Sequence, residues 1–218
     1  MNILVVEDQL MFCELLAKAC LGWAGAGKIV SVGRAAEAQA ALQRGEYKTM
    51  ILDIRLPDAD GFEFAEEAQQ ISPGLKIVGI SAYCDAFTAY RLTRSPLQAF
   101  IDKSTDTVSE LNAALDAVMS GGKYQSASIQ AAVRSLGSAS DSFMKLLSSR
   151  EIDILREVGA GHSDEMVGRV LKISPATVKW HRKQLMHKLG LGSHSELVIY
   201  ANKQGFSDLR DSRQPGFL

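Results

Sequence analysis

The sequence predicts an α/β fold, with a five-stranded parallel, doubly wound sheet followed by a small all-α domain of four helices. Short apolar runs alternate five times with segments of helical periodicity in residues 1–121. From residue 146 onward, only helical patterns occur. A length of 218 residues suits two small domains of this kind.

The five apolar runs of the first domain have the length and composition of buried strands. They lack the polar alternation of a sheet with one solvated face, which indicates that helices cover both faces. The predicted strands are residues 3–6, 28–32, 50–54, 76–80 and 99–101. The predicted helices are residues 10–21, 35–44, 63–71, 86–94 and 108–120, and Gly121 and Gly122 end the last of them.

Residues 122–145 differ from both neighbouring regions. They are rich in Ser, Ala and Gln, with a weak apolar pattern at Ile129, Val133 and Leu136. We interpret them as a linker with one short helix, and a sixth element of the first domain is the alternative. The tail, residues 207–218, has no predicted structure.

Four helices are predicted in residues 146–206, and a serine cap opens each of them. The caps are Ser148, Ser163, Ser174 and Ser193. Ser148 and Ser193 are each followed by Glu three residues later, which is the pattern of a capping box. About three residues separate the second and third helices, which is the spacing of a helix-turn-helix.

Composition excludes several classes of protein. An apolar fraction of 46% is that of a globular chain, and three cysteines without a CxxC pair indicate neither a disulfide framework nor a cysteine metal site. The first residues lack the basic region of a signal peptide, and no run is long enough to span a membrane. We therefore expect a cytoplasmic protein without a membrane partner, in which Cys13 and Cys20 are packing residues.

Charge is distributed unevenly along the chain. Residues 1–122 carry 10 basic and 16 acidic side chains, whereas residues 123–218 carry 14 basic and 9 acidic ones. This asymmetry makes the second half a candidate for binding nucleic acid.

Charged and hydroxyl side chains follow the predicted strands at the edge where parallel sheets bind ligands. They are Glu7, Asp8, Asp53, Ser81 and Lys103. Three carboxylates in one cleft need a cation, and oxygen ligands favour Mg²⁺. A carboxylate beside Mg²⁺ can attack phosphorus and become an aspartyl phosphate. Lys103 would then neutralise phosphate charge, and the Ser81 hydroxyl would donate to a phosphoryl oxygen.

Together with the segment from Asp53 to Gly61, these residues resemble the receiver domain of two-component response regulators, which has a flavodoxin-like fold. The resemblance spans residues 1–121. It implies that Asp53 accepts phosphate from a histidine kinase, that Asp8 binds the metal directly and Glu7 through water, and that the Arg55 carbonyl is another ligand. It also implies that Ser81 and Phe100 form a switch pair.

Structural alternatives apply to each of these residues. Adjacent acidic residues commonly lie on solvated loops, and an aromatic residue on a last strand is commonly a core residue, as Phe100 would then be. Arg55 lies two residues after the acceptor. Its guanidinium would either alter phosphodonor access or phosphate lifetime, or lie exposed.

The third helix of the C-terminal domain carries a basic face. Helical geometry groups Val178, Leu185 and Leu189 on the core side and places the residues of the basic face opposite. That opposite side has Ala176, Lys179, Trp180, Lys183 and His187. A basic outward face on the second helix of a helix-turn-helix enters the major groove of DNA. A solvated face without a ligand is the alternative.

Residues 146–204 resemble the LuxR/FixJ-type DNA-binding domain, and the whole chain then resembles NarL-like regulators. The motif residues include Arg150-Glu151, Ile173 to Lys179, His181 and Lys188-Leu189-Gly190. The predicted DNA-binding residues are Thr177, Lys179, Trp180, Lys183 and Lys188. Two residues depart from the pattern: Met166 replaces an acidic residue, and Gly168 predicts a less rigid second helix. Trp180 is bulky for a groove-facing position, and it would contact thymine methyl groups or pack on the receiver.

The predicted function is that of a DNA-binding transcriptional regulator and not an enzyme. Phosphorylation of Asp53 with Mg²⁺ would control dimerisation or exposure of the third helix, giving a homodimer on double-stranded DNA. Two alternatives stay open. An aspartyl-phosphate phosphohydrolase would need an acid two residues after Asp53, where Arg55 stands. A regulator that ignores phosphate would bind DNA constitutively.

Overall fold

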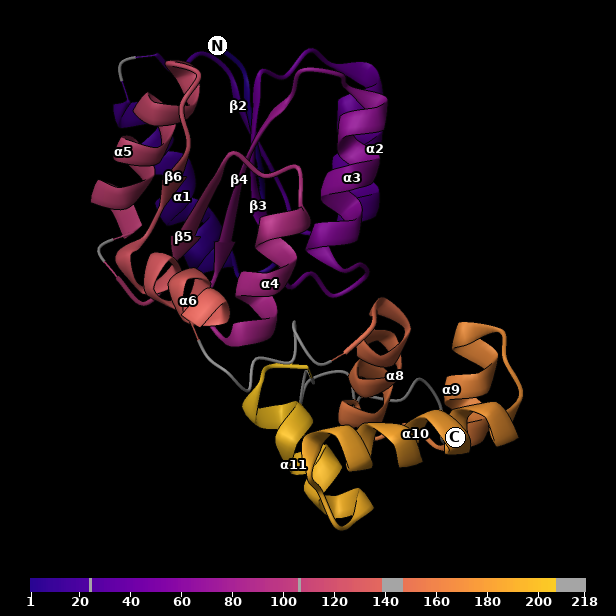
Figure 1. Ribbon diagram of the computed structural model, residues 1–218. Helices are drawn as coiled ribbons and strands as arrows, with labels where there is room; N and C mark the ends of the chain where they lie inside the picture. Colours follow the sequence, from indigo (N-terminus) through magenta and orange to yellow (C-terminus); the bar gives the residue numbers. More distant parts are fainter. Residues whose placement is uncertain (24, 106, 139–146, 207–218) are drawn as a thin grey trace. The chain divides into compact units, whose positions relative to one another are not determined.

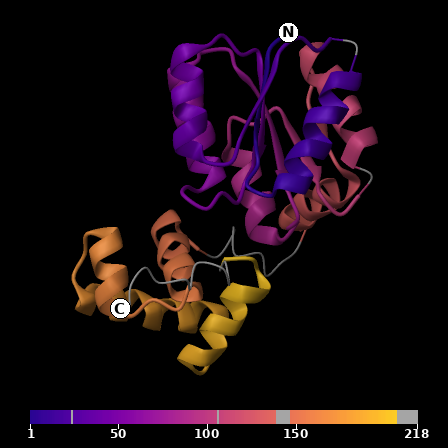
Figure 2. The ribbon, with the colours of Figure 1, turned by 180° about the vertical axis from the view of Figure 1, so that it is seen from behind.

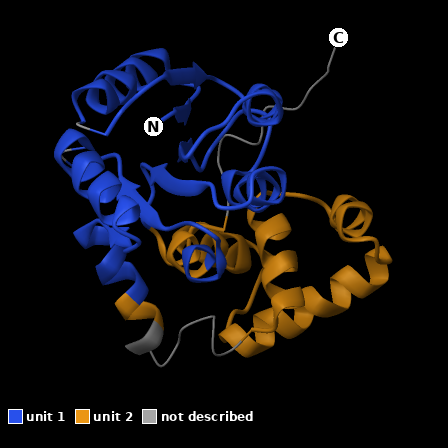
Figure 3. Cartoon of the chain, turned by 90° about the horizontal axis from the view of Figure 1, so that it is seen from above, with its two compact units in different colours: residues 1–84, 91–133 blue, residues 85–90, 134–218 orange. Residues whose placement is uncertain are grey.

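The computed structural model describes residues 1–23, 25–105, 107–138 and 147–206 (Figure 1). The chain divides into two compact units, residues 1–84 with 91–133, and residues 85–90 with 134–218 (Figure 3). Among the described residues, strands occur in the first unit alone. No helix in this described part is long and apolar enough to cross a bilayer.

The first unit is built on one parallel sheet in the strand order β2-β1-β3-β4-β5-β6. The strands are β1 (Ile3–Val6), β2 (Ile29–Val32), β3 (Thr49–Asp53), β4 (Lys76–Ser81), β5 (Ala99–Asp102) and β6 (Tyr124–Gln125). The five predicted strands are confirmed, with ends that shift by one residue at most. Every residue of β1 and β3 is buried, as expected for strands covered on both faces.

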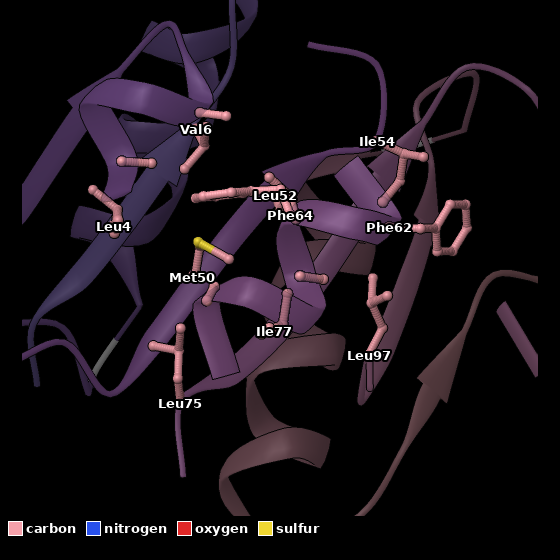
Figure 4. Close-up of a cluster of buried hydrophobic side chains, with 14 of the residues drawn as sticks. Leu4, Val6, Met50, Leu52, Ile54, Phe62, Phe64, Leu75, Ile77 and Leu97 are labelled. Carbon is pink, nitrogen blue, oxygen red and sulfur yellow. The ribbon is translucent and has the colours of Figure 1, made fainter. Parts of the chain in front are cut away.

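Helices cover both faces of the sheet and enclose two apolar cores (Figures 1 and 2). On one face lie α1 (Leu10–Gly22) and α5 (Thr107–Met119). On the other lie α2 (Ala35–Arg44), α3 (Gly61–Ile71) and α4 (Ala86–Arg94), which enclose the core shown in Figure 4. Cys20 is fully buried and Cys13 packs beside the same core, which confirms that both are packing residues.

The sheet has a sixth strand, and the prediction of a linker over residues 122–145 must be corrected accordingly. Tyr124 and Gln125 pair with Ala99 and Phe100 of β5. The helix that follows, α6 (Ala127–Ser138), places Ile129 in the core with no exposed surface. The sixth element that the sequence left as an alternative is therefore present. Residues 139–145 lie outside the described part of the chain.

The second unit contains α8 (Ser149–Gly159), α9 (Asp164–Leu171), α10 (Pro175–Leu189) and α11 (His194–Lys203). All four predicted serine caps accept a backbone N–H, and Ser148 with Glu151 forms a complete capping box. The second predicted box is half formed: Ser193 caps α11, but the Glu196 carboxylate accepts from the Gly192 N–H at 2.8 Å. Residue 146 and the tail 207–218 are not described.

Candidate functional site

The strand order places a crevice at the carboxyl edge of the sheet, where β1 lies between β2 and β3. The chain leaves β1 toward one side of the sheet and leaves β3 toward the other, so the loops that follow them diverge. Val6 is aligned with Leu52 across the strand pair. Glu7 and Asp8 are therefore next to Asp53.

The three predicted carboxylates meet in this crevice. Oxygen atoms of Glu7, Asp8 and Asp53 all lie within 4.8 Å of one another. Glu7 and Asp53 are 2% and 4% exposed, whereas Asp8 is open to solvent. An all-oxygen set with one solvated member matches the needs of Mg²⁺, which keeps part of its water shell.

Lys103 joins the cluster from the end of β5. Its Nζ lies 2.6 Å from Glu7 Oε2 and 2.8 Å from Asp53 Oδ2, so one ammonium bridges two buried carboxylates. The Lys103 backbone N–H donates to the Ser81 carbonyl at 2.8 Å, and this hydrogen bond positions the Lys103 backbone beside the end of β4. The predicted role of Lys103, which is to neutralise phosphate charge, stays a prediction.

Burial raises the pKa of both the Glu7 and the Asp53 carboxyl, and the charge of Asp53 adds to the effect on Glu7. The Lys103 ammonium opposes the increase in pKa at both groups. One ammonium thus does not fully compensate the buried carboxylates. A divalent cation is the kind of ligand that this uncompensated charge favours.

Backbone groups of the two neighbouring loops hold the reactive side chains. The Arg55 N–H donates to Asp53 Oδ1 at 3.0 Å, and the Tyr83 N–H donates to Ser81 Oγ at 3.1 Å. Ser81 is 1% exposed, so its side chain is buried.

Phe100 is a core residue in this structure. Its side chain has no exposed surface, and its ring stacks on Phe62 with centroids 6.1 Å apart. Its carbonyl accepts the Ser126 N–H at 3.0 Å, which connects it to the chain beyond β6. The switch role predicted for Phe100 stays a prediction.

Sequence reasoning missed Tyr83. The Arg55 guanidinium carbon lies 3.5 Å from the centroid of the Tyr83 ring, and this stack joins the loops after β3 and β4. Tyr83 is 42% exposed. One signal in the sequence could have identified Tyr83. It lies two residues after Ser81, just as Arg55 lies two residues after Asp53.

Two residues of the loop after Asp53 have structural roles, Asp60 and Gly61. Asp60 caps α3 and also pairs with Arg91. A Cβ at Gly61 would lie 2.5 Å from the Ile54 Cα, so this position requires glycine.

In the second unit, α10 presents the predicted basic face. Val178 and Leu185 are fully buried, whereas Lys179, Trp180 and Lys183 are exposed. Trp180 is 57% exposed, and its ring meets the edge of His181 at a centroid distance of 4.8 Å. Thr177 is half-buried near the start of the helix, and its hydroxyl lies 2.7 Å from Ser174 Oγ.

Two cations of α10 make ion pairs within the unit. Lys188 Nζ lies 2.7 Å from Glu151 Oε1, and Arg182 Nη1 lies 2.9 Å from Asp164 Oδ1. These pairs connect α10 to α8 and α9. The DNA-binding role predicted for Lys188 stays a prediction, and its ion pair shows a structural role beside it.

Two family models match this chain. Residues 3–116 match the response regulator receiver domain, and residues 145–201 match the bacterial regulatory proteins of the luxR family. The two matched ranges contain the acidic crevice and α10, respectively.

Curated relatives match over most of this chain. The Fimbriae Z protein of Escherichia coli is 31% identical over 153 residues, which is 70% of this chain and 72% of the relative. The probable transcriptional regulatory protein NarL of Mycobacterium tuberculosis is 23% identical over 210 residues, which is 95% of this chain and 96% of the relative.

Solved structures share the fold. RcsB from Salmonella enterica serovar Typhimurium, bound to a promoter in the presence of a phosphomimetic, has a TM-score of 0.62 at 19% identity and covers 93% of this chain and 98% of its own. A LuxR-family response regulator from Aurantimonas has a TM-score of 0.58 at 19% identity and covers 63% of this chain and 98% of its own.

The fold, the acidic crevice and both family matches agree. Members of this family are transcriptional response regulators that bind DNA and are not enzymes. The chain belongs to the LuxR family of two-component response regulators, with a receiver domain followed by a DNA-binding helix-turn-helix domain.

Proposed function

We propose that Asp53 accepts a phosphoryl group from a histidine kinase in a Mg²⁺-dependent reaction, and that this modification controls DNA binding. The observation that carries the proposal is the cluster of Glu7, Asp8 and Asp53, with oxygens within 4.8 Å of one another and Lys103 bridging two of them. DNA is the ligand of the second domain, so the protein acts in the cytoplasm.

The residues that would hold Mg²⁺ are Asp8, Asp53 and the Arg55 carbonyl, with Glu7 acting through water. When bound, Mg²⁺ supplies positive charge that keeps the carboxylates ionised and offsets the charge of the incoming phosphoryl oxygens. The fit rests on the all-oxygen donor set and on burial, which raises the pKa of the Glu7 and Asp53 carboxyls while no second ammonium pairs with them among the described residues.

In the transfer, an Asp53 carboxylate oxygen forms the new bond to phosphorus, and the phosphorus–nitrogen bond of the kinase phosphohistidine breaks. Lys103, now 2.8 Å from Asp53 Oδ2, pairs with a phosphoryl oxygen. The Ser81 hydroxyl donates to another phosphoryl oxygen. It thereby changes the contact that it makes with the Tyr83 N–H in the unmodified protein.

The switch pair carries this change through the sheet. Ser81 ends β4, and Phe100 lies on β5, the strand that pairs with it. Movement of Ser81 toward the phosphoryl group alters the packing beside Phe100, which stacks on Phe62. Such a change between two packed states is how a small local event shifts a whole domain.

In the second domain, α10 enters the major groove of double-stranded DNA. The exposed Lys179 and Lys183 contact DNA phosphates or guanine bases. Thr177, near the start of α10, contacts the DNA backbone, and Trp180 contacts thymine methyl groups. Phosphorylation favours a homodimer that presents two copies of α10 to adjacent half-sites, or frees α10 for binding.

The test treats the full chain with acetyl phosphate and Mg²⁺ and follows intact mass and DNA affinity on genomic fragments. We expect one phosphate on Asp53 and tighter, more selective DNA binding, and Asp53→Asn should lose both. Phosphorylation without a change in DNA affinity would refute the link between the domains. Strong DNA binding without any phosphorylation would instead identify a constitutive regulator.

A further inference from the structure

We propose that Asp102 is a positioning residue for Lys103, and that the hydroxyl groups of Ser126 and Ser128, around the start of α6, hold Asp102 in place. The segment that leads out of the receiver domain thereby affects the rate at which Asp53 is phosphorylated. This inference rests on the proposed function, because it concerns the same reaction. It adds residues that neither touch the phosphoryl group nor bind the metal.

Asp102 is a buried acidic residue at the end of β5, and it is not one of the three clustered carboxylates. It is 5% exposed. Ser104 donates both its N–H and its hydroxyl to Asp102 Oδ1, at 2.9 and 2.6 Å, and the Ser128 hydroxyl donates to Asp102 Oδ2 at 2.7 Å. Burial raises the pKa of Asp102, but the hydrogen bonds from Ser104 and Ser128 outweigh burial, and the pKa lies below its usual range. The group is therefore a carboxylate at neutral pH.

This carboxylate fixes the turn that contains Lys103. Because Ser104 directly follows Lys103, the hydrogen bonds from Ser104 to Asp102 close a turn with the lysine in its middle. The Asp102 carbonyl accepts from the Thr105 hydroxyl at 2.8 Å, and the Lys103 N–H donates to the Ser81 carbonyl at 2.8 Å. The backbone on both sides of Lys103 is thus held by hydrogen bonds.

The start of α6 holds Asp102 from the other side. The Ser126 hydroxyl accepts the Asp102 N–H at 3.0 Å and donates to the Glu110 carboxylate, and Ser126 has no exposed surface. Ser126 directly precedes α6, where a serine commonly caps the first turn, but its hydroxyl contacts β5 and α5 instead. Ser128, in the first turn of α6, donates to the carboxylate itself. One residue, Asp102, therefore connects this segment to Lys103.

The place of the Lys103 ammonium depends on this turn, because a lysine side chain is long and flexible. The ammonium lies 2.6 Å from Glu7 Oε2 and 2.8 Å from Asp53 Oδ2, and the Lys103 side chain is 9% exposed. In the proposed reaction it pairs with a phosphoryl oxygen, so its backbone has to stay fixed while its partner changes. A misplacement of about 1 Å can slow a reaction by about 100-fold. A turn released from Asp102 therefore slows phosphorylation.

The experiment measures the rate of phosphorylation. Full-length protein is mixed with acetyl phosphate and saturating Mg²⁺, and the phosphorylated fraction is followed by intact mass. We expect Asp102→Asn to be phosphorylated about ten times more slowly than the unmodified sequence, because the amide loses the charge and opposes the Ser104 donors with its own N–H groups. Ser128→Ala, which removes a single hydrogen bond, should be about three times slower.

Two serine substitutions are the matched controls. Ser128→Thr keeps the hydroxyl and should retain the rate of the unmodified sequence. Ser120→Ala removes an exposed hydroxyl at the end of α5, where it donates to the Asp116 carbonyl at 2.8 Å, and should leave the rate unchanged.

A combination with Lys103→Met separates positioning from a general loss of structure. Without the ammonium there is nothing left for Asp102 to position. Asp102→Asn should therefore slow the Lys103→Met protein no further, whereas a general loss of structure would slow both backgrounds by the same factor.

The outcomes distinguish the inference from the function on which it rests. No phosphate on the unmodified protein would refute the proposed function and this inference with it. Normal phosphorylation with equal rates in Asp102→Asn, Ser128→Ala and Ser120→Ala would refute the positioning role alone. The same slowing by Asp102→Asn with and without the Lys103 ammonium would also overturn it, since Asp102 would then serve only the stability of the fold.

Discussion

At the scale of single residues, Gly168 shows why a helix propensity needs the tertiary structure beside it. On α9, glycine suggests a less rigid helix, since it costs about 1 kcal/mol against alanine. In the structure, a Cβ at this position would lie 2.7 Å from the Ile173 carbonyl oxygen. Ile173 lies in the turn between α9 and α10. Glycine is present because the turn passes too close for any side chain.

Gly168→Ala should therefore destabilise the second domain, although helix propensity alone predicts a gain of about 1 kcal/mol. We expect a net loss of about 1–3 kcal/mol from the overpacked contact with Ile173. Denaturant unfolding followed through Trp180 fluorescence, in a Trp23→Phe background, measures it. A stabilised Gly168→Ala variant would show that the turn can move away from the added methyl group without loss of stability.

Lys103 is the residue on which the metal-free crevice depends. Lys103→Met leaves two buried carboxylates without their cation, and loss of one partner from such a cluster costs about 3–5 kcal/mol. We expect this loss in EDTA and a smaller one in saturating Mg²⁺, because the metal replaces the missing charge. Thermal unfolding in the two buffers gives the comparison.

Lys18→Met is the matched control for this experiment. Lys18 pairs with Glu14 at 4.0 Å, and both side chains are more than 70% exposed. Its removal should change stability by less than about 0.5 kcal/mol in either buffer. Equal losses for Lys103→Met with and without Mg²⁺ would contradict a shared site for the ammonium and the metal.

Glu151 gives the second domain a dependence on acid. Burial by itself raises the pKa of this carboxyl, but hydrogen bonds from Lys188 and Ser148 outweigh burial, and the pKa lies below its usual range. A lowered folded-state pKa stabilises the fold above the unfolded-state value of about 4.3. This stability is lost as the pH falls from there through the folded-state pKa.

Glu151→Gln tests that pH dependence, because glutamine keeps the capping pattern and removes the charge. We expect a loss of about 1–2 kcal/mol at pH 7 and a smaller loss at pH 3, because the wild-type carboxyl takes up a proton as the pH falls through its folded-state pKa. Urea unfolding at both pH values, followed through Trp180, supplies the measurement. A loss of the same size at pH 3 would mean that shape and not charge matters.

At the scale of elements, β6 and α6 extend the receiver domain beyond α5. Strand β6 has only two residues, and α6 adds the fully buried Ile129 to the core. The Ser126 hydroxyl accepts the Asp102 N–H at 3.0 Å, and Ser128 Oγ donates to Asp102 Oδ2 at 2.7 Å. Because Asp102 precedes Lys103, the chain that leaves the receiver is hydrogen-bonded beside the phosphorylation site.

Ile129→Ala should destabilise the first domain by about 2–5 kcal/mol, which is the usual cost of removing a buried isoleucine side chain. Ala131→Ser replaces an exposed residue on the same helix and should change the free energy of unfolding by less than about 0.5 kcal/mol. Calorimetry of the full chain measures both. Equal effects of the two variants would show that α6 does not belong to the core.

At the scale of the whole molecule, the two halves of the chain carry opposite excess charge. The acidic excess of residues 1–122 includes the crevice that would hold a cation, and the basic excess of residues 123–218 includes α10. Each domain thus carries the charge opposite to that of its expected ligand.

Electrostatics of this kind predicts a measurable salt dependence. Lys179→Ala and Lys183→Ala should each weaken DNA binding and lower the slope of log affinity against log salt by about 0.9. Lys203→Ala removes an exposed lysine from the last turn of α11 and should leave the slope unchanged. Unchanged slopes for both α10 variants would place the DNA-contacting surface elsewhere.

Local signals determined much of this protein from sequence alone. Strands β1 to β5 were predicted because each contains a short, largely apolar run, and the four C-terminal helices because each begins at a serine that caps its first turn. Asp53 and Lys103 were predicted to meet because parallel strands end at one edge of a sheet.

Contacts between distant residues were decided only by the tertiary structure. The pairing of β6 depends on a free edge at β5, which no pattern within Tyr124–Gln125 reveals. Likewise, the Arg55–Tyr83 stack and the ion pair of Lys188 join segments far apart in the chain. The physical reason is that hydrophobic periodicity and caps are local properties, whereas a side-chain contact depends on where the folded chain brings its partner.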